Sequence, residues 1–244
     1  MRLLSYNIHK GIGGRDRRYA LPRIIEVIEA ENPDIICLEE VDRHVRRSHY
    51  DDQPKLLAER FRFDAADFQL NVHVGDRGGG YGNLVLSRWP IIRHHHVSLR
   101  FNRRKPRGAQ VVVVDTPEGS LHLVHWHLGL AEVERQWQVA HLLTHASYRE
   151  SSELPTILFG DFNDWRNQIA HRALANVGFT QVTAPPSQFR SFPAWMALGS
   201  LDKAFVRGAI QVPRARIVRT AMSRVASDHL PLVVDLHLGE TPLE

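Results

Sequence analysis

The sequence has a single cysteine and no hydrophobic run long enough to cross a membrane. Cys37 cannot form an internal disulfide, and it lies in the apolar run 35–38, where we expect it to be a buried small hydrophobic residue. Charged residues interrupt every apolar stretch, so we expect no transmembrane segment. The first residues do not have the pattern of a signal peptide. We therefore expect a protein of the reducing cytoplasm.

The sequence also lacks a strong excess of charge of either sign, and it has no linker, repeat or low-complexity block. Its 244 residues carry a formal net charge of +4, with His counted as neutral. This mildly basic balance suits an anionic substrate without requiring nucleic acid. We expect one domain spanning residues 1–244.

Apolar segments of strand length alternate with segments of helical periodicity. Strands are predicted at residues 2–8, 35–38, 70–74, 83–87, 109–115, 121–127, 156–159, 201–206, 217–220 and 232–236. Helices are predicted at residues 21–28, 54–61, 130–149 and near 169–175. The glycine-rich segment 75–82 is predicted to be a mobile loop. This mixture predicts an α/β protein with two packed sheets between helices.

The strand at residues 156–159 is followed by Gly160, Asp161 and Asn163. In extended chain, residues two apart face the same side, so Asp161 and Asn163 would face one site. A carboxylate and an amide at a strand end suit a phosphate ester with a metal or a water to activate. Gly-Asp and Asn-Asp are also common in turns, and the stretch taken alone would favour an ordinary polar turn.

Polar residues recur at the ends of other apolar strands. They are Asn7, Glu40, His127, Asp202, Asp228 and His229. Each one alone has an ordinary structural explanation, but their shared placement indicates a site at the strand ends. Mg²⁺ prefers oxygen ligands, a His backed by a carboxylate is a positioned acid or base, and Asn and His can hold a phosphoryl oxygen. Together they suit metal-assisted attack of water on a phosphate ester.

The triplet His94-His95-His96 has the composition of a metal cluster. Consecutive residues of a strand face opposite sides of the sheet, however, and metal ligands must converge. We therefore do not expect a metal site at this triplet.

With these motifs, the sequence resembles the endonuclease/exonuclease/phosphatase superfamily, and most closely its small bacterial members of unassigned substrate. The pieces that carry the resemblance occur in the family's order along nearly the whole chain. They are Leu4-Ser5-Tyr6-Asn7, residues 35–41, residues 82–91, His127-Leu128-Gly129, Gly160-Asp161-Phe162-Asn163, residues 201–206 and Ser227-Asp228-His229-Leu230-Pro231. The resemblance implies a four-layer α/β sandwich, in which two mixed β-sheets pack face to face with helices outside.

The resemblance also implies a role for each residue of the pattern. A divalent metal, usually Mg²⁺ with Mn²⁺ as the alternative, would bind Glu40 with Asn7 beside it and Asp228 near the metal or the water. Asp161 and Asn163 would position the water and the phosphate, and His127 would hold a phosphate oxygen. Asp202 would orient His229, and either Asp161 or His229 would be the general base. Some nucleic-acid-cleaving members carry an acid two residues after the first Asn, where this sequence has His9.

Two segments bear on the substrate. The basic runs at 43–47 and 103–107, with Arg107 in the second, favour a polyanion, although such loops are usually only solvated. The apolar segment 189–198 precedes Asp202. It either packs on the core or forms an apolar lip that contacts the substrate through Trp195.

We therefore predict a Mg²⁺-dependent phosphodiesterase that hydrolyses a lipid headgroup or another small diester. A DNA or RNA nuclease of the same fold is the alternative, because aromatic residues also stack on bases. A non-catalytic nucleic-acid-binding protein is a third, and the intact acids and His229 argue against it. No protein partner can be inferred.

Overall fold

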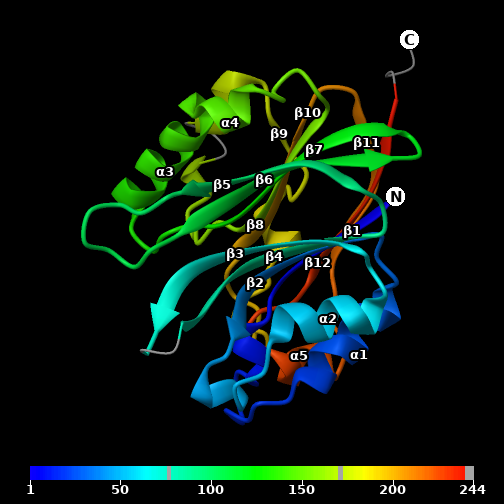
Figure 1. The fold of residues 1–244 in the computed structure, drawn as a ribbon. Helices are drawn as coiled ribbons and strands as arrows, with labels where there is room; N and C mark the ends of the chain where they lie inside the picture. Colours follow the sequence, from blue (N-terminus) through cyan, green and yellow to red (C-terminus); the bar gives the residue numbers. More distant parts are fainter. Residues whose placement is uncertain (76–77, 170–172, 240–244) are drawn as a thin grey trace.

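Two six-stranded sheets pack face to face in the computed structural model, which describes residues 1–75, 78–169 and 173–239 (Figure 1). The first sheet has the order β11-β12-β1-β2-β4-β3, and the second has the order β5-β6-β7-β8-β10-β9. The strands of the first sheet are β1 (Arg2–Asn7), β2 (Ile35–Arg43), β3 (Ala65–Val74), β4 (Gly79–Ser87), β11 (Ile210–Ile217) and β12 (Leu232–Leu238). Those of the second are β5 (Ile91–Ser98), β6 (Gly108–Thr116), β7 (Gly119–His127), β8 (Thr156–Asp161), β9 (Thr180–Gln181) and β10 (Asp202–Arg207).

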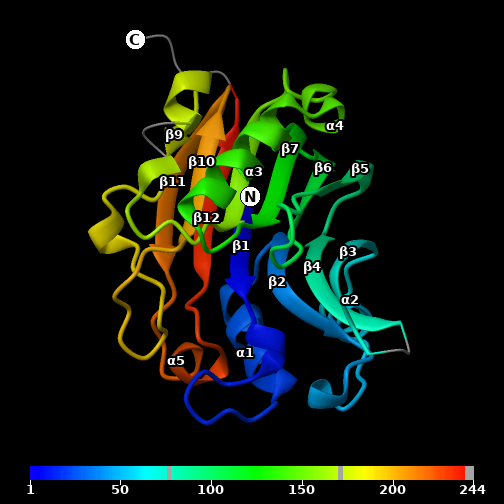
Figure 2. The same ribbon diagram turned by 90° about the vertical axis from the view of Figure 1, so that its left-hand side faces the viewer.

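Helices cover the outer face of each sheet (Figures 1 and 2). Helices α1 (Leu21–Glu31), α2 (Gln53–Phe61) and α5 (Ser223–Ala226) lie on the first sheet, and α3 (Glu132–Thr144) and α4 (Ala146–Arg149) lie on the second. Both sheets are mixed, because β1 is parallel to β2 and β7 is parallel to β8, whereas the other neighbours are antiparallel. The predicted four-layer sandwich is confirmed. None of the described helices is long and apolar enough to cross a membrane.

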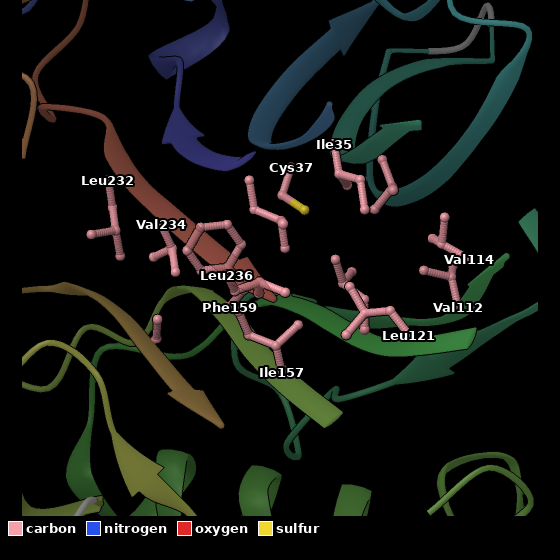
Figure 3. Packing of buried hydrophobic residues seen from close by; sticks show 14 of the residues in the cluster. Ile35, Cys37, Val112, Val114, Leu121, Ile157, Phe159, Leu232, Val234 and Leu236 are labelled. Carbon is pink, nitrogen blue, oxygen red and sulfur yellow. The ribbon is translucent and has the colours of Figure 1, made fainter. Parts of the chain in front are cut away.

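The core between the sheets consists of those side chains of each strand that point toward the opposite sheet. Ile35 and Cys37 of β2 point toward Ile157 and Phe159 of β8, and all four are fully buried (Figure 3). Complete burial of an Ile or Phe side chain contributes roughly 1.5–3 kcal/mol to the stability of the fold. The alternate residues of β2 pack under the helices instead. This dry interface fixes the two sheets relative to each other, and hence the positions of their strand ends.

Residues 79–82 of the glycine-rich segment begin strand β4, whereas its composition predicts a mobile loop, and Gly75 and Gly78 lie in turns. The neighbouring strand β3 shifts register between Leu70 and Val72. A Cβ atom on Gly82 would lie 1.8 Å from the carbonyl oxygen of Gln69. The glycine therefore permits close backbone approach beside the irregular strand. The helix expected near 169–175 falls partly outside the described residues.

Candidate active site

A cleft of about 330 Å³ opens where strand ends of the two sheets meet. Seven of the strand-end residues singled out above line it: Asn7, Glu40, His127, Asp161, Asn163, Asp228 and His229. Arg107 also lines it, and Asp202 lies directly behind His229. Strands β1, β2, β7 and β8 run toward this end, whereas β10 and β12 start from it. Their carboxyl or amino ends therefore bring residues from the whole length of the chain together.

Glu40 enters the cleft because β2 is irregular at this point. The register of β2 on β4 shifts between Leu38 and Val41, and Glu40 has a left-handed backbone with φ +57°. The normal alternation is thereby interrupted. Glu39 stays between the sheets, where Oε1 lies 2.8 Å from Nε2 of His125, while Glu40 turns into the cleft.

Cationic side chains surround Glu40. Burial by itself would raise the pKa of the Glu40 carboxyl, but an ion pair with Lys10 and the charges of Lys105 and His9 outweigh it, and the pKa is lowered to about 2. Glu40 is therefore a carboxylate at any physiological pH.

Asp161 is the most connected acid in the cleft. Its Oδ2 accepts a hydrogen bond from Nδ2 of Asn7 at 3.2 Å and lies 3.3 Å from Nε2 of His127, while its Oδ1 accepts one from the backbone N–H of Asn163 at 2.9 Å. Gly160 precedes it with φ +139°, and a Cβ there would lie 2.1 Å from the carbonyl oxygen of Trp126. Burial raises the pKa of Asp161 to about 6, against the opposing charge of His229.

His229 lies between two acids. Its Nδ1 lies 2.9 Å from Oδ2 of Asp202, and its Nε2 lies 3.7 Å from Oδ2 of Asp161. Ser191 donates a hydrogen bond to the same oxygen of Asp202, which fixes the carboxylate. Burial alone would lower the pKa of His229, but Asp202 and Asp161 raise it well above its usual range. The imidazole is therefore held in its charged form.

The surroundings of His127 favour its neutral form, in contrast to those of His229. Burial and the nearby charge of Arg107 hold its pKa well below the usual range, so it is neutral. The cleft thus contains one neutral and one charged histidine on either side of Asp161. A neutral imidazole can offer one N–H donor to a ligand without adding a charge.

Arg107 is buried, and its Nε has no hydrogen-bond partner among the described residues. It lines the cleft beside Lys105 and Lys10. Both lysine ammonium groups lie over the ring of Tyr81, at 5.1 and 5.2 Å from its centroid. A buried guanidinium with an unpaired donor is costly unless an anion completes its hydrogen bonds. This wall of the cleft is suited to a phosphate group.

Of the residues described, the oxygen donors near Glu40 fit a hard divalent cation. Glu40 is ionised, and Asn7 and the half-buried Asp228 line the same cleft. One or two carboxylates with an amide and water are the usual donors to Mg²⁺ or Mn²⁺. His9 lies 3.9 Å from Asp228, so the position that could have supplied a further carboxylate supplies an imidazole instead.

The aromatic side chains at the cleft are only partly those that the sequence indicated. Phe192 lines the cleft with its ring 4.8 Å from that of His229, and Trp165, which the sequence reading missed, lines it as well. Trp195 lies outside the lining, near Gly14 and Asp228, and is 38% exposed. Phe189 is buried in the core. The segment 189–198 therefore contains both a core residue and exposed apolar residues.

Among the lining residues that strand-end reasoning did not identify are Lys10, Lys105, Trp165 and Leu130. Lys10 lies in the short 3₁₀ helix His9–Gly11, directly after β1, and Trp165 follows the Asp161 motif within four positions. Closeness in sequence to the strand-end motifs was the available signal for these two. Lys105 lies in a basic run that resembled a solvated loop, and nothing in the pattern marked Leu130.

Comparison with known proteins identifies the family of the chain. The family model described as Endonuclease/Exonuclease/phosphatase family matches residues 4–229. The uncharacterized protein YbhP of Escherichia coli K12 is 32% identical over 248 residues, which cover 97% of this chain and 96% of YbhP.

Solved structures share the fold. A protein from Beutenbergia cavernae described as endonuclease/exonuclease/phosphatase superposes with a TM-score of 0.82 at 24% identity, over 100% of this chain and 73% of that one. The human Nocturnin catalytic domain, solved with a bound sulfate anion, superposes with a TM-score of 0.75 at 22% identity, over 98% and 93% of the two chains. The match over residues 4–229 and the similarity to YbhP along almost the full length of both chains show that this chain belongs to the endonuclease/exonuclease/phosphatase family.

Proposed function

We propose that this protein is a divalent-metal-dependent phosphodiesterase in which an activated water attacks phosphorus. Its family comprises hydrolytic enzymes that act on phosphoesters. The observation that carries the proposal is the arrangement in one cleft of an ionised Glu40, a buried Arg107 with an unpaired donor, and Asp161 next to His229. These are a cation site, an anion site and an acid–base pair within one small volume.

Glu40 would hold the cation, with Asn7 and Asp228 completing the oxygen donors. When bound, a divalent cation would supply positive charge that polarises a phosphoryl oxygen and stabilises the charge of the transition state. Lys10 would have to share Glu40 with the cation or move away from it, because its ammonium contacts the same carboxylate.

Asp161 would accept the proton of the attacking water. It is held by Asn7 and the backbone of Asn163, and its raised pKa places it close to the range where a carboxylate is an effective base. His229 is a poor candidate for this role, because Asp202 and Asp161 keep it protonated. As an imidazolium it would instead stabilise negative charge on the phosphoryl oxygens.

Three donors would hold the phosphate. The Arg107 guanidinium has an unpaired Nε, His127 is neutral and can donate from Nε2, and Nδ2 of Asn163 is kept in place by the carbonyl oxygen of Leu128 at 3.0 Å. A monoester dianion and a diester monoanion would both be attracted to Arg107.

The cleft mouth favours a substrate with an apolar or aromatic part. Trp165 and Leu130 line the cleft and are more than half exposed, and Met196 and Leu198 of the segment 189–198, outside the lining, are exposed to a similar extent. These side chains could contact the acyl or headgroup portion of a lipid. The same Trp165, together with Lys105 and Arg107, also favours a nuclease, since bases stack on exposed aromatic rings beside a cationic wall.

A hydrolysis screen with purified protein tests the proposal. Bis-p-nitrophenyl phosphate, p-nitrophenyl phosphate, DNA, RNA and phospholipid vesicles are each incubated with Mg²⁺, with Mn²⁺ and with excess chelator. We expect the diesters to be cleaved faster than the monoester, and cleavage to stop with chelator. Undiminished cleavage by protein that elemental analysis shows to be metal-free would refute the metal requirement. Binding of nucleic acid without hydrolysis of any substrate would support the non-catalytic alternative.

A further inference from the structure

We propose that Asp67, His94 and His96 form a second metal site, selective for a borderline cation such as Zn²⁺, that joins the edges of the two sheets. Asp67 lies on β3, the edge strand of the first sheet, and both histidines lie on β5, the edge strand of the second. The nearest ligating atoms of the three residues all lie within 4.8 Å of one another. The cluster shares no residue with the lining of the catalytic cleft.

The distances are close to those of a tetrahedral site. Oδ1 of Asp67 lies 3.1 Å from Nδ1 of His94 and 2.9 Å from Nε2 of His96. Zinc bonds of 2.0–2.1 Å place neighbouring tetrahedral ligands roughly 3.3 Å apart. Small rotations of the two rings would therefore complete three of four positions. His94 has 64% of its side chain exposed, so water can reach the fourth.

The histidine triplet contributes two ligands and not three. The expectation that consecutive strand residues diverge holds for His95, which lies 3.1 Å from Glu150 instead. His94 and His96, however, are two positions apart and therefore share one face of the strand, which that expectation did not take into account. It also could not find Asp67, because only the packing of β3 beside β5 brings that carboxylate to them.

Asp67 is held in place from inside the protein. Nε2 of Gln110 donates to its Oδ2 at 2.6 Å and to its backbone carbonyl at 2.7 Å. Oε1 of Gln110 in turn lies 3.0 Å from Nδ1 of His125. Asp67 is only 6% exposed, so its ligating oxygens are fixed before any ion arrives. Hydrogen-bonded partners behind a ligand are a regular feature of metal sites and strengthen binding.

The donor set distinguishes this site from the one at Glu40. Two imidazole nitrogens with one carboxylate suit Zn²⁺, whereas the oxygen donors around Glu40 suit Mg²⁺. A cation bound here would bridge two edge strands that belong to different sheets. Because the ligands come together only in the folded protein, binding would raise the melting temperature.

Zinc binding by the purified full chain tests the proposal, with excess Mg²⁺ present to occupy the cleft. We expect His94→Ala and His96→Ala to bind one equivalent of Zn²⁺ fewer than wild type by equilibrium dialysis. Saturating Zn²⁺ should raise the wild-type melting temperature by roughly 5 °C, and this rise should be absent from both variants. His95→Ala is the matched control and should bind as wild type, because its ring faces Glu150.

Spectroscopy with Co²⁺ gives an independent measurement. Tetrahedral Co²⁺ absorbs strongly in the visible range, and this absorption should be present in wild type and His95→Ala and absent in His96→Ala. His94 is largely exposed, so its substitution should not unfold the protein, whereas substitution of the buried Asp67 could. Equal zinc stoichiometry in His94→Ala, His96→Ala and His95→Ala would overturn the proposal and leave the cluster as a pair of His–Asp contacts.

Discussion

Asp161 and Asp202 are direct partners in the antiparallel pairing of β8 with β10, so two buried carboxylates leave the sheet side by side. Like charges directly opposite on neighbouring strands destabilise a sheet. His229 comes from the segment before β12 and offsets this repulsion, with one ring nitrogen facing each acid. The fold thus holds a charged histidine between two buried acids in the wall of the cleft.

Asp161→Asn should reduce turnover by at least about a hundredfold, because the amide cannot accept the proton of the attacking water. It should not lower the melting temperature, since it also removes a charge opposite Asp202. The measurement is the rate on bis-p-nitrophenyl phosphate together with a thermal melt. Asp115→Asn, an exposed position on β6, is the control. Near-normal turnover in Asp161→Asn would exclude the proposed base.

Arg107→Met should weaken inhibition by inorganic phosphate roughly 10- to 100-fold. This factor corresponds to the free energy that a hydrogen bond to a charged group usually contributes. The reason is that Arg107 is buried in the cleft with an unpaired Nε. The measurement is the inhibition constant of inorganic phosphate for wild type, for Arg107→Met and for the control variant Arg103→Met. Arg103→Met, in the same basic run but exposed, should leave inhibition unchanged. Equal effects would mean that the run attracts phosphate only through its overall charge.

Lys10→Met should tighten Mn²⁺ binding roughly tenfold, because the ammonium competes for Glu40 and repels a cation there. Binding is measured by the paramagnetic relaxation of water protons, in a His96→Ala background that lacks the proposed site at Asp67. Lys55→Met, an exposed residue of α2, should bind as wild type. Weaker Mn²⁺ binding in Lys10→Met would show that Lys10 positions Glu40 for the ion instead of competing with it.

The titration of His122 should lower the free energy of unfolding in mild acid. Burial, with Arg207 and Arg93 nearby, lowers its pKa to about 4, while the unfolded chain titrates near 6.5. Its folded-state pKa is depressed, so the unfolded state takes up the proton first, and the stability is lost as the pH falls from about 6.5 toward 4.

Urea unfolding at pH 7.5 and pH 5 tests this effect. Wild type should lose about 2 kcal/mol more than His122→Gln between the two values. Other titrating groups contribute equally to both proteins and cancel in the difference. An identical loss in the two proteins would mean that His122 titrates alike in the folded and unfolded states.

Trp165→Ala and Trp195→Ala should reduce hydrolysis of a lipid or nucleic-acid substrate more than hydrolysis of bis-p-nitrophenyl phosphate. Both rings are partly exposed at or beside the cleft, so they can contact the substrate beyond its phosphate. Thermal melts should show little change. Trp137→Ala on α3, comparably exposed and outside the cleft lining, is the control. Equal losses on both substrates together with lower melting temperatures would identify the rings as structural.

The strands, and hence the layered architecture, could be predicted from the sequence. Runs such as residues 35–38 and 156–159 are apolar throughout because both faces of their strands are covered, one by the other sheet and one by helices. The family motifs were visible for a related reason. Asn7, Asp161 and Asp202 each adjoin such a run, so a local reading could associate them with strand ends without knowing which strands are neighbours.

Other features depended on tertiary structure, because they join residues that no local pattern relates. The turn of Glu40 into the cleft requires the register shift of β2 against β4. Charge along the sequence made Arg107 a candidate for binding an anionic substrate, but only the tertiary structure buries it in the cleft. Asp67 meets His94 and His96 only because the edge strands of two different sheets lie side by side. Strand formation follows from periodicity along the chain, whereas these contacts follow from register and sheet packing, which periodicity does not specify.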